Sequence, residues 1–240
     1  MIELRRPAGR YARVGHRGAS ALAPENTLEA FALAVELGCD MLEFDVLDAA
    51  DGSLVVAHDP RRSLAPGVVS LDAALAFFAE RLPATVLQVD LKRRGLEAAV
   101  VDALRRHGVY SRSWVSSFDA GSLRRLADLA PDLPRSYTLP RDRLGISKRR
   151  PFAPVVRGAL ASLGASLPRR LPALLARSKA HALTLHHSVA SAAAITRAHE
   201  LEAAVYVWTV DDPTRAGSLV RAGADGIITN DPRVFSRLTT

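Results

Sequence analysis

Short apolar segments alternate with amphipathic helical segments along the whole chain, and this alternation limits the fold more than any other feature of the sequence. We predict eight strands, near residues 12–15, 41–47, 85–91, 113–117, 134–139, 182–186, 204–210 and 226–229. Strands that alternate with helices form parallel sheets with crossover connections. Eight of them favour a closed, TIM-type (β/α)8 barrel. An open doubly wound sheet is the alternative, but no glycine-rich dinucleotide loop follows the first strand.

The helical segments between these strands have recognisable starts and ends. The first follows the sequence Pro24-Glu25-Asn26-Thr27, where Asn26 or Thr27 is the expected N-cap, and Gly38 ends it. Later helices are predicted over residues 71–81, 96–106, 120–129, 189–201 and 213–221. At 240 residues, a chain with this pattern is expected to form a single domain over residues 1–240.

The segment after the fifth strand is irregular. Residues 139–179 are too many for one connection and include five prolines, so we predict a helical insertion at about 140–180 made of two broken helices. This insertion leaves the barrel at the carboxyl ends of the strands, which is the face that carries the active site in barrel enzymes.

The same insertion concentrates the positive charge of the chain. The formal net charge is +7, whereas residues 141–179 contain ten Lys and Arg residues and one acid, Asp142, for a net charge of +9. The rest of the chain therefore carries −2, which argues against a nucleic-acid binder and for one anionic contact surface. Two interpretations stay open: a solvated helix exterior, and an amphipathic element that docks on anionic membranes.

Two further features concern location and redox chemistry. Residues 1–13 lack the apolar core of a signal peptide, and no apolar run approaches the length that spans a bilayer. We therefore expect a cytoplasmic protein whose membrane contact, if any, is peripheral. The single cysteine, Cys39, has no internal disulfide partner, and its place before an apolar strand predicts a buried side chain.

Two carboxylates two residues apart mark the second strand. Glu43 and Asp45 point to the same face of that strand, while their apolar neighbours point to the other. Like charges this close repel unless a cation lies between them, and clustered carboxylates suit a hard divalent ion. On the next strand, Gln88, Asp90 and Lys92 also share one face. Asp90 would complete a three-carboxylate metal site, and Lys92 would hold a phosphate oxygen.

Histidines flank the carboxylate strand along the sequence. His16 precedes it and His58 follows it, so both are candidates for proton transfer. The alternative for the paired carboxylates is a salt-bridge network with Arg17 and Lys92.

An ordered set of short motifs links these residues. It comprises His16-Arg17-Gly18, Pro24-Glu25-Asn26-Thr27, Glu43-Phe44-Asp45-Val46, His58-Asp59, Asp90-Leu91-Lys92, Val115-Ser116-Ser117-Phe118-Asp119, Val207-Trp208-Thr209-Val210-Asp211 and Gly223-Ala224-Asp225-Gly226-Ile227-Ile228-Thr229-Asn230. In this order the motifs resemble the glycerophosphodiester phosphodiesterase family. The resemblance runs from about Val14 to Pro232, nearly the whole chain.

The resemblance implies a TIM-type barrel enzyme, a phosphoric diester hydrolase that uses Ca²⁺ or Mg²⁺ to hydrolyse glycerophosphodiesters to an alcohol and glycerol 3-phosphate. By position it implies that His16 and His58 are the catalytic acid/base pair. The other site residues are the metal ligands Glu43, Asp45 and Asp90, the phosphate contacts Arg17 and Lys92, and the substrate-wall aromatic Trp208. The family usually has Glu where this chain has Asp90, and the shorter side chain is still expected to reach a flexible Ca²⁺ shell or to act on Mg²⁺ through water.

The chain departs from the family pattern after the His58-Asp59 pair. Family members usually carry a substantial insertion there that walls one side of the pocket, whereas only residues 60–69 precede the next helix here. The pocket is therefore expected to be more open. Two alternatives follow: a lysophospholipase D that acts on lysophospholipids at membranes, and a non-catalytic barrel that binds phospholipid headgroups through residues 141–179. The sequence does not indicate an oligomeric state.

Several other aromatic and histidine side chains have simpler explanations. His181, His186 and His187 have few acids nearby, so we expect them at the barrel rim, with His186 as a candidate for the pocket lining, and not around a transition metal. Trp208 lies at a strand end, where both a packing role and a substrate contact stay open.

Overall fold

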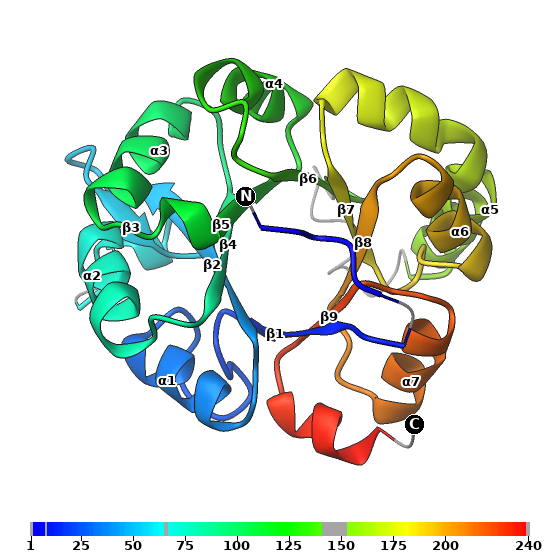
Figure 1. Cartoon of the computed structure of the whole chain (residues 1–240), viewed down its shortest axis with the longest axis horizontal. Coiled ribbons are helices and arrows are strands. Elements are labelled where there is room, and N and C mark those ends of the chain that lie inside the picture. Colours follow the sequence, from blue (N-terminus) through cyan, green and yellow to red (C-terminus); the bar gives the residue numbers. More distant parts are fainter. Residues whose placement is uncertain (1, 8, 65–66, 141–152, 239–240) are drawn as a thin grey trace.

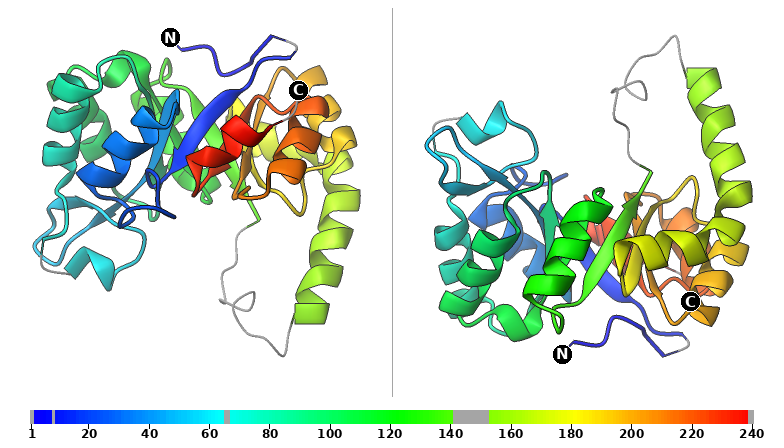
Figure 2. Two further views of the ribbon diagram at one scale, coloured as in Figure 1. Left: turned by 90° about the horizontal axis from the view of Figure 1, so that it is seen from below. Right: turned by 90° about the horizontal axis from the view of Figure 1, so that it is seen from above.

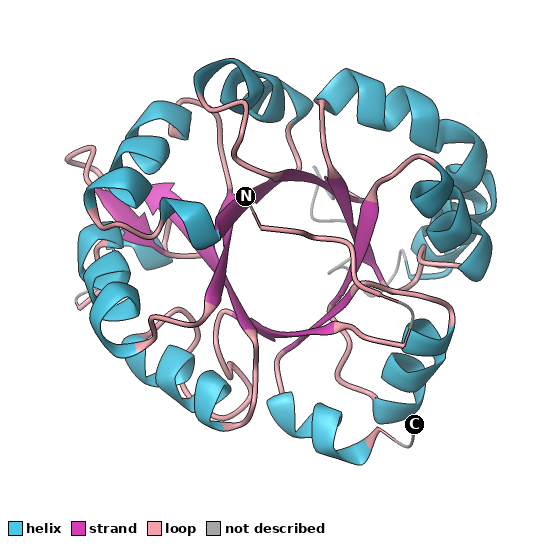
Figure 3. Ribbon diagram, in the orientation of Figure 1, coloured by secondary structure: helices cyan, strands magenta, loops and turns pink. Residues whose placement is uncertain are grey.

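The strands close into a parallel barrel with helices packed around its outside (Figures 1 and 3). The structure is a computed structural model that describes all residues except 1, 8, 65–66, 141–152 and 239–240. The barrel strands are β1 (Ala12–His16), β2 (Met41–Asp48), β4 (Val86–Leu91), β5 (Ser113–Ser117), β6 (Arg135–Leu139), β7 (Ala182–His186), β8 (Ala204–Trp208) and β9 (Gly226–Thr229). Each pairs in parallel with its neighbours, and β1 joins β2 to β9 to close the ring. The predicted (β/α)8 barrel is confirmed.

Most helices begin at or next to the predicted residue. The helices are α1 (Leu28–Glu36), α2 (Leu71–Arg81), α3 (Glu97–Arg106), α4 (Ala120–Leu129), α5 (Ala153–Ser178), α6 (Ala192–Glu200) and α7 (Pro213–Arg221), with short 3-10 turns η1 (Arg62–Leu64), η2 (Tyr110–Arg112) and η5 (Pro232–Arg237). However, α6 begins at Ala192, after the Ser191 cap, and not at the predicted residue 189. Thr27, not Asn26, caps α1 by accepting the N–H of Ala30. Ser70 caps α2 in the same way, because a side-chain oxygen satisfies a backbone donor that the first turn leaves free.

One strand was not predicted. β3 (Leu54–Val56) pairs antiparallel with β2 after a tight turn, and three residues are too few to show a periodic pattern. Its end is fixed against β2 because the N–H of Ala57 donates to the carbonyl of Asp45 at 3.1 Å. This contact brings His58 to the carboxylate strand.

Apolar side chains fill two regions, one between the strands and the helices and one inside the barrel. In the first, Phe78 of α2 packs on Phe31 and Phe44 with ring centroids 5.0 and 5.2 Å apart. In the second, the rings of Trp114 and Tyr206 lie 4.8 Å apart. Both are fully buried, so the amino-terminal half of the barrel is a packed core.

The N-terminal segment crosses the opening at the amino-terminal end of the barrel (Figure 1). Leu4 is buried there, and its carbonyl accepts a hydrogen bond from the Tyr206 hydroxyl at 3.1 Å. Arg6 adds a backbone N–H bond to the buried carboxylate of Asp225 at 2.9 Å. These contacts hold the segment over that end of the barrel.

The predicted insertion after β6 differs from expectation. Residues 153–178 form the single helix α5, with Pro168 and Pro172 inside it, and not two broken helices. The helix changes direction along its length, and its first half extends past the carboxyl ends of the strands (Figure 2). Proline removes one N–H and bends a helix without ending it when packing holds both sides. Leu167 and Leu171 supply that packing because both are buried against the barrel. The basic residues at 141, 143 and 148–150 lie outside the described residues.

Cys39 lies at the entrance to β2 and is buried, as predicted. Burial raises the pKa of its thiol to about 12, and the nearby Asp40 carboxylate adds to the effect. Among the described residues, no helix combines the length and apolarity needed to cross a membrane.

Candidate active site

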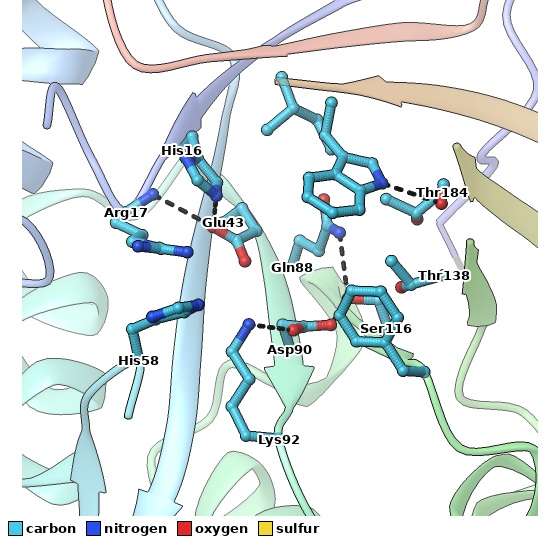
Figure 4. A pocket seen from close by; sticks show the side chains of 13 residues that line it. His16, Arg17, Glu43, His58, Gln88, Asp90, Lys92, Ser116, Thr138 and Thr184 are labelled. Atoms are coloured by element: carbon cyan, nitrogen blue, oxygen red, sulfur yellow. Dashed lines mark hydrogen bonds and ion pairs between the residues drawn. The ribbon is translucent and has the colours of Figure 1, made fainter. Parts of the chain in front are cut away.

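A pocket with about 430 Å³ of empty space, its solvent-open mouth included, lies at the carboxyl ends of the barrel strands and is lined by seven of the eight predicted site residues (Figure 4). These are His16, Arg17, Glu43, His58, Asp90, Lys92 and Trp208. Six further side chains complete the lining: Gln88, Ser116, Phe118, Thr138, Thr184 and Ile228. The eighth predicted residue, Asp45, is fully buried and contacts the pocket residues Arg17 and Lys92.

Strand register explains why residues far apart in sequence meet here. β2 and β4 pair so that Glu43 lies beside Gln88 and Asp45 beside Asp90. On the other side of β2, His16 is in register with Glu43. Because parallel neighbours in register direct their side chains alike, the acidic residues and the imidazole converge inside the barrel mouth.

The three carboxylates form one buried cluster. Ligand oxygens of Glu43, Asp45 and Asp90 all lie within 4.8 Å of one another, and the described residues contain no second cluster of this kind. Lys92 Nζ contacts Asp45 and lies 2.5 Å from Asp90 Oδ2. Arg17 Nε lies 2.8 Å from Asp45 Oδ2. The cluster thus contains three acids and two cationic side chains.

Asp45 is the carboxylate that the cationic side chains neutralise. Burial disfavours its charged form, but the charges of Lys92 and Arg17 outweigh burial and hold its pKa well below the usual range. The reciprocal effect acts on Lys92, where burial disfavours the ammonium while Asp45 and Asp90 raise its pKa overall. Asp45 therefore contacts both of the salt-bridge partners that the sequence offered.

Glu43 has no such partner. Its Oε2 accepts the backbone N–H of Arg17 at 3.1 Å and lies 3.9 Å from His16 Nε2, and no Lys or Arg side chain pairs with it within the described chain. Burial raises the pKa of Glu43 well above its usual value, and the charge of Asp45 raises it further. With all three acids ionised, the cluster keeps one uncompensated negative charge. Oxygen donors with excess negative charge fit a hard divalent cation.

Two imidazoles face the pocket from neighbouring segments (Figure 4). Burial lowers the pKa of His16 to about 4, and the charge of Arg17 acts in the same direction. Burial also lowers the pKa of His58, while the Asp45 carboxylate opposes the shift. Both rings are therefore neutral near pH 7 in the absence of a ligand, a state in which one ring nitrogen can accept a proton.

The backbone at Arg17 and Gly18 forms a tight turn in the left-handed region. Arg17 has φ of 55°, and Gly18 follows with φ of 81°. A Cβ on Gly18 would lie 2.5 Å from the carbonyl carbon of Ala30, so only glycine fits this close approach. The Arg17 guanidinium is held at Nη1 by Glu25 at 2.9 Å and at Nε by Asp45. This turn explains the His-Arg-Gly motif physically.

Aromatic rings form one wall of the pocket. Phe118 and Trp208 meet edge to face with centroids 5.8 Å apart, and Trp208 Nε1 donates to the Thr184 carbonyl at 3.1 Å. The buried Gln88 Oε1 and Thr138 Oγ1 on the lining have no hydrogen-bond partner among the described residues. A substrate hydroxyl or a water would satisfy such atoms.

Two of the three predicted rim histidines, His186 and His187, lie around this wall, at the carboxyl end of β7. His186 is 5.1 Å from Trp208 and 4.3 Å from His187 by ring centroids, and its side chain supports the wall without lining the pocket. The third, His181, precedes β7 and lies at the opposite end of the barrel, where its Nδ1 accepts the backbone N–H of Arg135 at 3.3 Å.

Sequence reasoning gave no role in the site to three side chains that hold it together. Asn26 Nδ2 donates to Asp45 at 3.0 Å, and Ser116 Oγ donates to Asp90 at 2.6 Å. Asn230 Oδ1 lies 2.7 Å from His16 Nδ1. All three residues lie in short motifs of the sequence, and this position was the only sign of a role in the site. Their partners could not be predicted, because they lie on other segments of the chain.

Comparison with known proteins decides the family. The profile of the glycerophosphoryl diester phosphodiesterase family matches residues 16–77 and 84–234. The chain belongs to this family. The glycerophosphodiester phosphodiesterase of Caldanaerobacter subterraneus is similar to it, with 29% identity over an alignment of 258 residues that covers 94% of this chain and 96% of that one. Membership of the glycerophosphoryl diester phosphodiesterase family confirms the predicted enzyme class, which is hydrolysis of glycerophosphodiesters.

Solved structures of similar proteins share the barrel. A glycerophosphodiester phosphodiesterase from Parabacteroides distasonis has a TM-score of 0.74 at 20% identity and covers 97% of this chain and 100% of its own. An Oleispira antarctica phosphodiesterase, solved in complex with its product sn-glycerol-3-phosphate, has a TM-score of 0.72 at 22% identity and covers 94% and 95%. At these identities the likeness supports the fold of the family.

Proposed function

We propose that the pocket hydrolyses glycerophosphodiesters to an alcohol and glycerol 3-phosphate, with His16 and His58 as the acid/base pair. The observation that carries the proposal is that two neutral imidazoles, a guanidinium and a buried carboxylate cluster line one cavity. Each of these groups has a task in phosphodiester cleavage. The aromatic wall at Trp208 lies at the other side of the same pocket, where it would contact the alcohol or the glycerol.

In this mechanism the cationic side chains bind the phosphate. The diester carries one negative charge, and more charge develops on the phosphoryl oxygens in the transition state. Arg17 and Lys92 would stabilise that charge, and both are held in place by buried carboxylates. One neutral imidazole removes a proton from the nucleophile, either water or the neighbouring glycerol hydroxyl. The other imidazole takes up a proton when the anionic diester binds and then donates that proton to the departing oxygen.

The carboxylate cluster would hold a divalent cation, Ca²⁺ or Mg²⁺, through Glu43, Asp45 and Asp90. When bound, such an ion neutralises phosphoryl charge and lowers the pKa of a coordinated hydroxyl or water. The bound ion would stabilise the charge of Glu43 most, because no Lys or Arg side chain pairs with Glu43 in the described chain.

The direct test is turnover of a headgroup panel by the chelated protein, with Ca²⁺ or Mg²⁺ added back. We expect activity on glycerophosphodiesters that disappears with chelation and returns with one of the two ions. His16→Ala and His58→Ala should each lose at least about 100-fold in kcat while remaining folded. His107→Ala, on the outer surface beside Asp72, is the matched control and should keep wild-type turnover. Full activity in His16→Ala would contradict the assignment.

A second proposal concerns lipid substrates: that α5 docks the enzyme on anionic membranes, where the open pocket takes lysophospholipids. The first half of α5 extends past the pocket face (Figure 2). It contains Val155, a residue that is 68% exposed. The whole helix contains four arginines and no acid. A helix that exposes an apolar side chain beside arginines, with no acid, favours anionic lipid headgroups.

Vesicle sedimentation tests this second proposal. We expect binding to vesicles of anionic lipid and little binding to phosphatidylcholine vesicles, with weaker binding for the Val155→Ser/Arg157→Gln double variant. Arg105→Gln on α3 removes the same single charge from the outer wall of the barrel and should bind like the wild type. Equal binding to both vesicle types would contradict membrane docking, and turnover of glycerophosphocholine without turnover of lysophosphatidylcholine would contradict the lipid substrate.

The remaining sequence-based expectations form part of the same proposal. Residues 1–240 would act as one catalytic domain in the cytoplasm, with peripheral attachment to membranes through residues 141–179. A barrel that binds phospholipid headgroups without turnover is disfavoured, because His16, His58 and all three acids are present and converge.

A further inference from the structure

A chain of hydrogen bonds holds His16 where β9 closes the barrel against β1. β1 and β9 are parallel neighbours, with Gly15 in register with Thr229, so His16 and Asn230 leave the two strands side by side. His16 Nδ1 lies 2.7 Å from Asn230 Oδ1. The carboxylate of Asp211, beyond the end of β8, contacts Asn230 from the other side.

Asp211 fixes which way the Asn230 amide points. Asn230 Nδ2 donates to Asp211 Oδ2 at 2.7 Å, and the backbone N–H of Asn230 donates to Oδ1 at 2.8 Å. Thr229 Oγ1 donates to the same Oδ1 at 2.9 Å. A carboxylate only accepts hydrogen bonds, so the amide must present its NH₂ group to Asp211 and its oxygen to His16. Ser20 Oγ donates to that oxygen at 2.9 Å and reinforces this orientation.

This polarity determines the tautomer of His16. Because Asn230 Oδ1 is an acceptor, the facing Nδ1 of His16 must carry the hydrogen. In the neutral ring, Nε2 then has the free lone pair, and Nε2 is the nitrogen that points to Glu43, at 3.9 Å, inside the pocket.

We infer that Asp211 and Asn230 are positioning residues that lock His16 in the Nδ1–H tautomer, so that Nε2 is the proton acceptor in the reaction. The inference rests on the proposed function and adds residues to it. It also divides the roles of the two imidazoles, since the described structure gives His58 no comparable carboxylate-backed partner. Outer partners of this kind typically contribute 10- to 100-fold to activity through the residue that they orient.

An exchange of the two side chains tests the inference sharply. In Asp211→Asn, one of the two oxygens that accept from the Asn230 NH₂ and the Asn230 backbone N–H is replaced by an NH₂ group. In either orientation of the new amide, one contact then pairs a donor with a donor, so the orientation of the Asn230 amide is no longer fixed. The double variant Asp211→Asn/Asn230→Asp restores every contact. The new amide at 211 donates to the new carboxylate at 230, and that carboxylate accepts from His16 Nδ1 and Ser20. Asp212→Asn is the matched control, because it removes an acid from the same loop and keeps an N-cap for α7.

Two measurements distinguish positioning from a structural effect. We expect Asp211→Asn to lower kcat about 10- to 100-fold while KM changes by less than about 3-fold. The kcat of the double variant should recover to within about 5-fold of the wild type, and Asp212→Asn should keep the wild-type kcat. Imidazole ¹⁵N NMR of the metal-free protein, with His16 assigned from a His16→Gln spectrum, should show Nδ1–H in the wild type and the double variant and a mixed or Nε2–H state in Asp211→Asn.

Each outcome bears on one proposal or the other. An Nε2–H signal in the wild type, or unchanged kcat in Asp211→Asn, would overturn the positioning inference. A double variant as impaired as the single one would also overturn it. If the wild type has no phosphodiesterase turnover, the proposed function fails, while the NMR tautomer measurement still decides the hydrogen-bond chain independently.

Discussion

The Lys92 ammonium lies 2.5 Å from Asp90 Oδ2, two residues back along the same strand, and it contacts Asp45 as well. A single buried amine thus binds two of the three acids of the site. The third acid, Glu43, is left to His16 and a backbone N–H. This uneven distribution of positive charge leads to distinct predictions for each part of the cluster.

Lys92→Met should destabilise the chelated protein by about 3 kcal/mol, because two buried carboxylates lose a shared cation. A divalent ion should recover more stability in this variant than in the wild type, since the ion replaces the missing charge. Lys179→Met is the control: Lys179 pairs with Asp128 at the surface, so its loss should cost less than about 1 kcal/mol. Urea denaturation with and without the ion measures both effects, and equal losses in the two variants would contradict the prediction.

Ser116→Ala should weaken divalent-ion binding about 10-fold or more, because Ser116 Oγ orients Asp90 by a hydrogen bond of 2.6 Å. Ser136→Ala removes the same hydroxyl from the next strand, where Ser136 contacts Thr184 at 2.7 Å, and should leave ion affinity unchanged. Calorimetric titration of each chelated protein gives the affinities. Unchanged ion affinity in Ser116→Ala would show that Asp90 does not need the hydrogen bond from Ser116 in order to bind the ion.

The stability of the chelated protein should fall in acid because of His16. Its pKa is lowered from 6.5 to about 4 by burial, so between these values the unfolded chain binds a proton that the folded protein does not. The contribution is present above pH 6.5 and is lost as the pH falls to 4. From pH 7 to pH 5 the wild type should therefore lose about 2 kcal/mol more than His16→Asn. Parallel stability curves for the two proteins would contradict the shift.

Phe78→Ala should cost about 3–5 kcal/mol, because the ring is fully buried between Phe31 and Phe44 and its removal leaves a cavity. Phe77→Ala, one residue earlier on the same helix, removes a partly exposed ring and should cost clearly less. Thermal and urea denaturation measure the difference. Similar costs at both positions would show that the cluster around Phe78 relaxes to fill the space.

Local periodicity predicted the strands that carry the site well. The two-residue repeat alone aligns Glu43 with Asp45 and Asp90 with Lys92, because these pairs need only one strand each. The starts of the helices predicted over 71–81 and 213–221 were equally visible, since a cap contacts the next turn of its own helix.

Contacts that depend on barrel closure could not be derived in this way. Asn230 and His16 are 214 residues apart, and nothing in either local sequence shows that β9 returns to β1. Asn26 illustrates a second limit: its place before α1 suggested a cap, but with φ of 61° it turns inward and binds Asp45. α5 shows a third, because burial of Leu167 outweighs the local tendency of its prolines to end a helix.

The N-terminal segment over the barrel floor has a consequence for the order of events in a catalytic cycle. In the described part of the chain, Trp114 and Tyr206 fill the barrel below the pocket, and Leu4 covers them from outside. Reactant and both products must therefore share the entrance at the carboxyl ends of the strands. For the proposed reaction in this pocket, we therefore expect the fragment nearest that entrance to depart first and the fragment bound deeper to compete with the next substrate molecule.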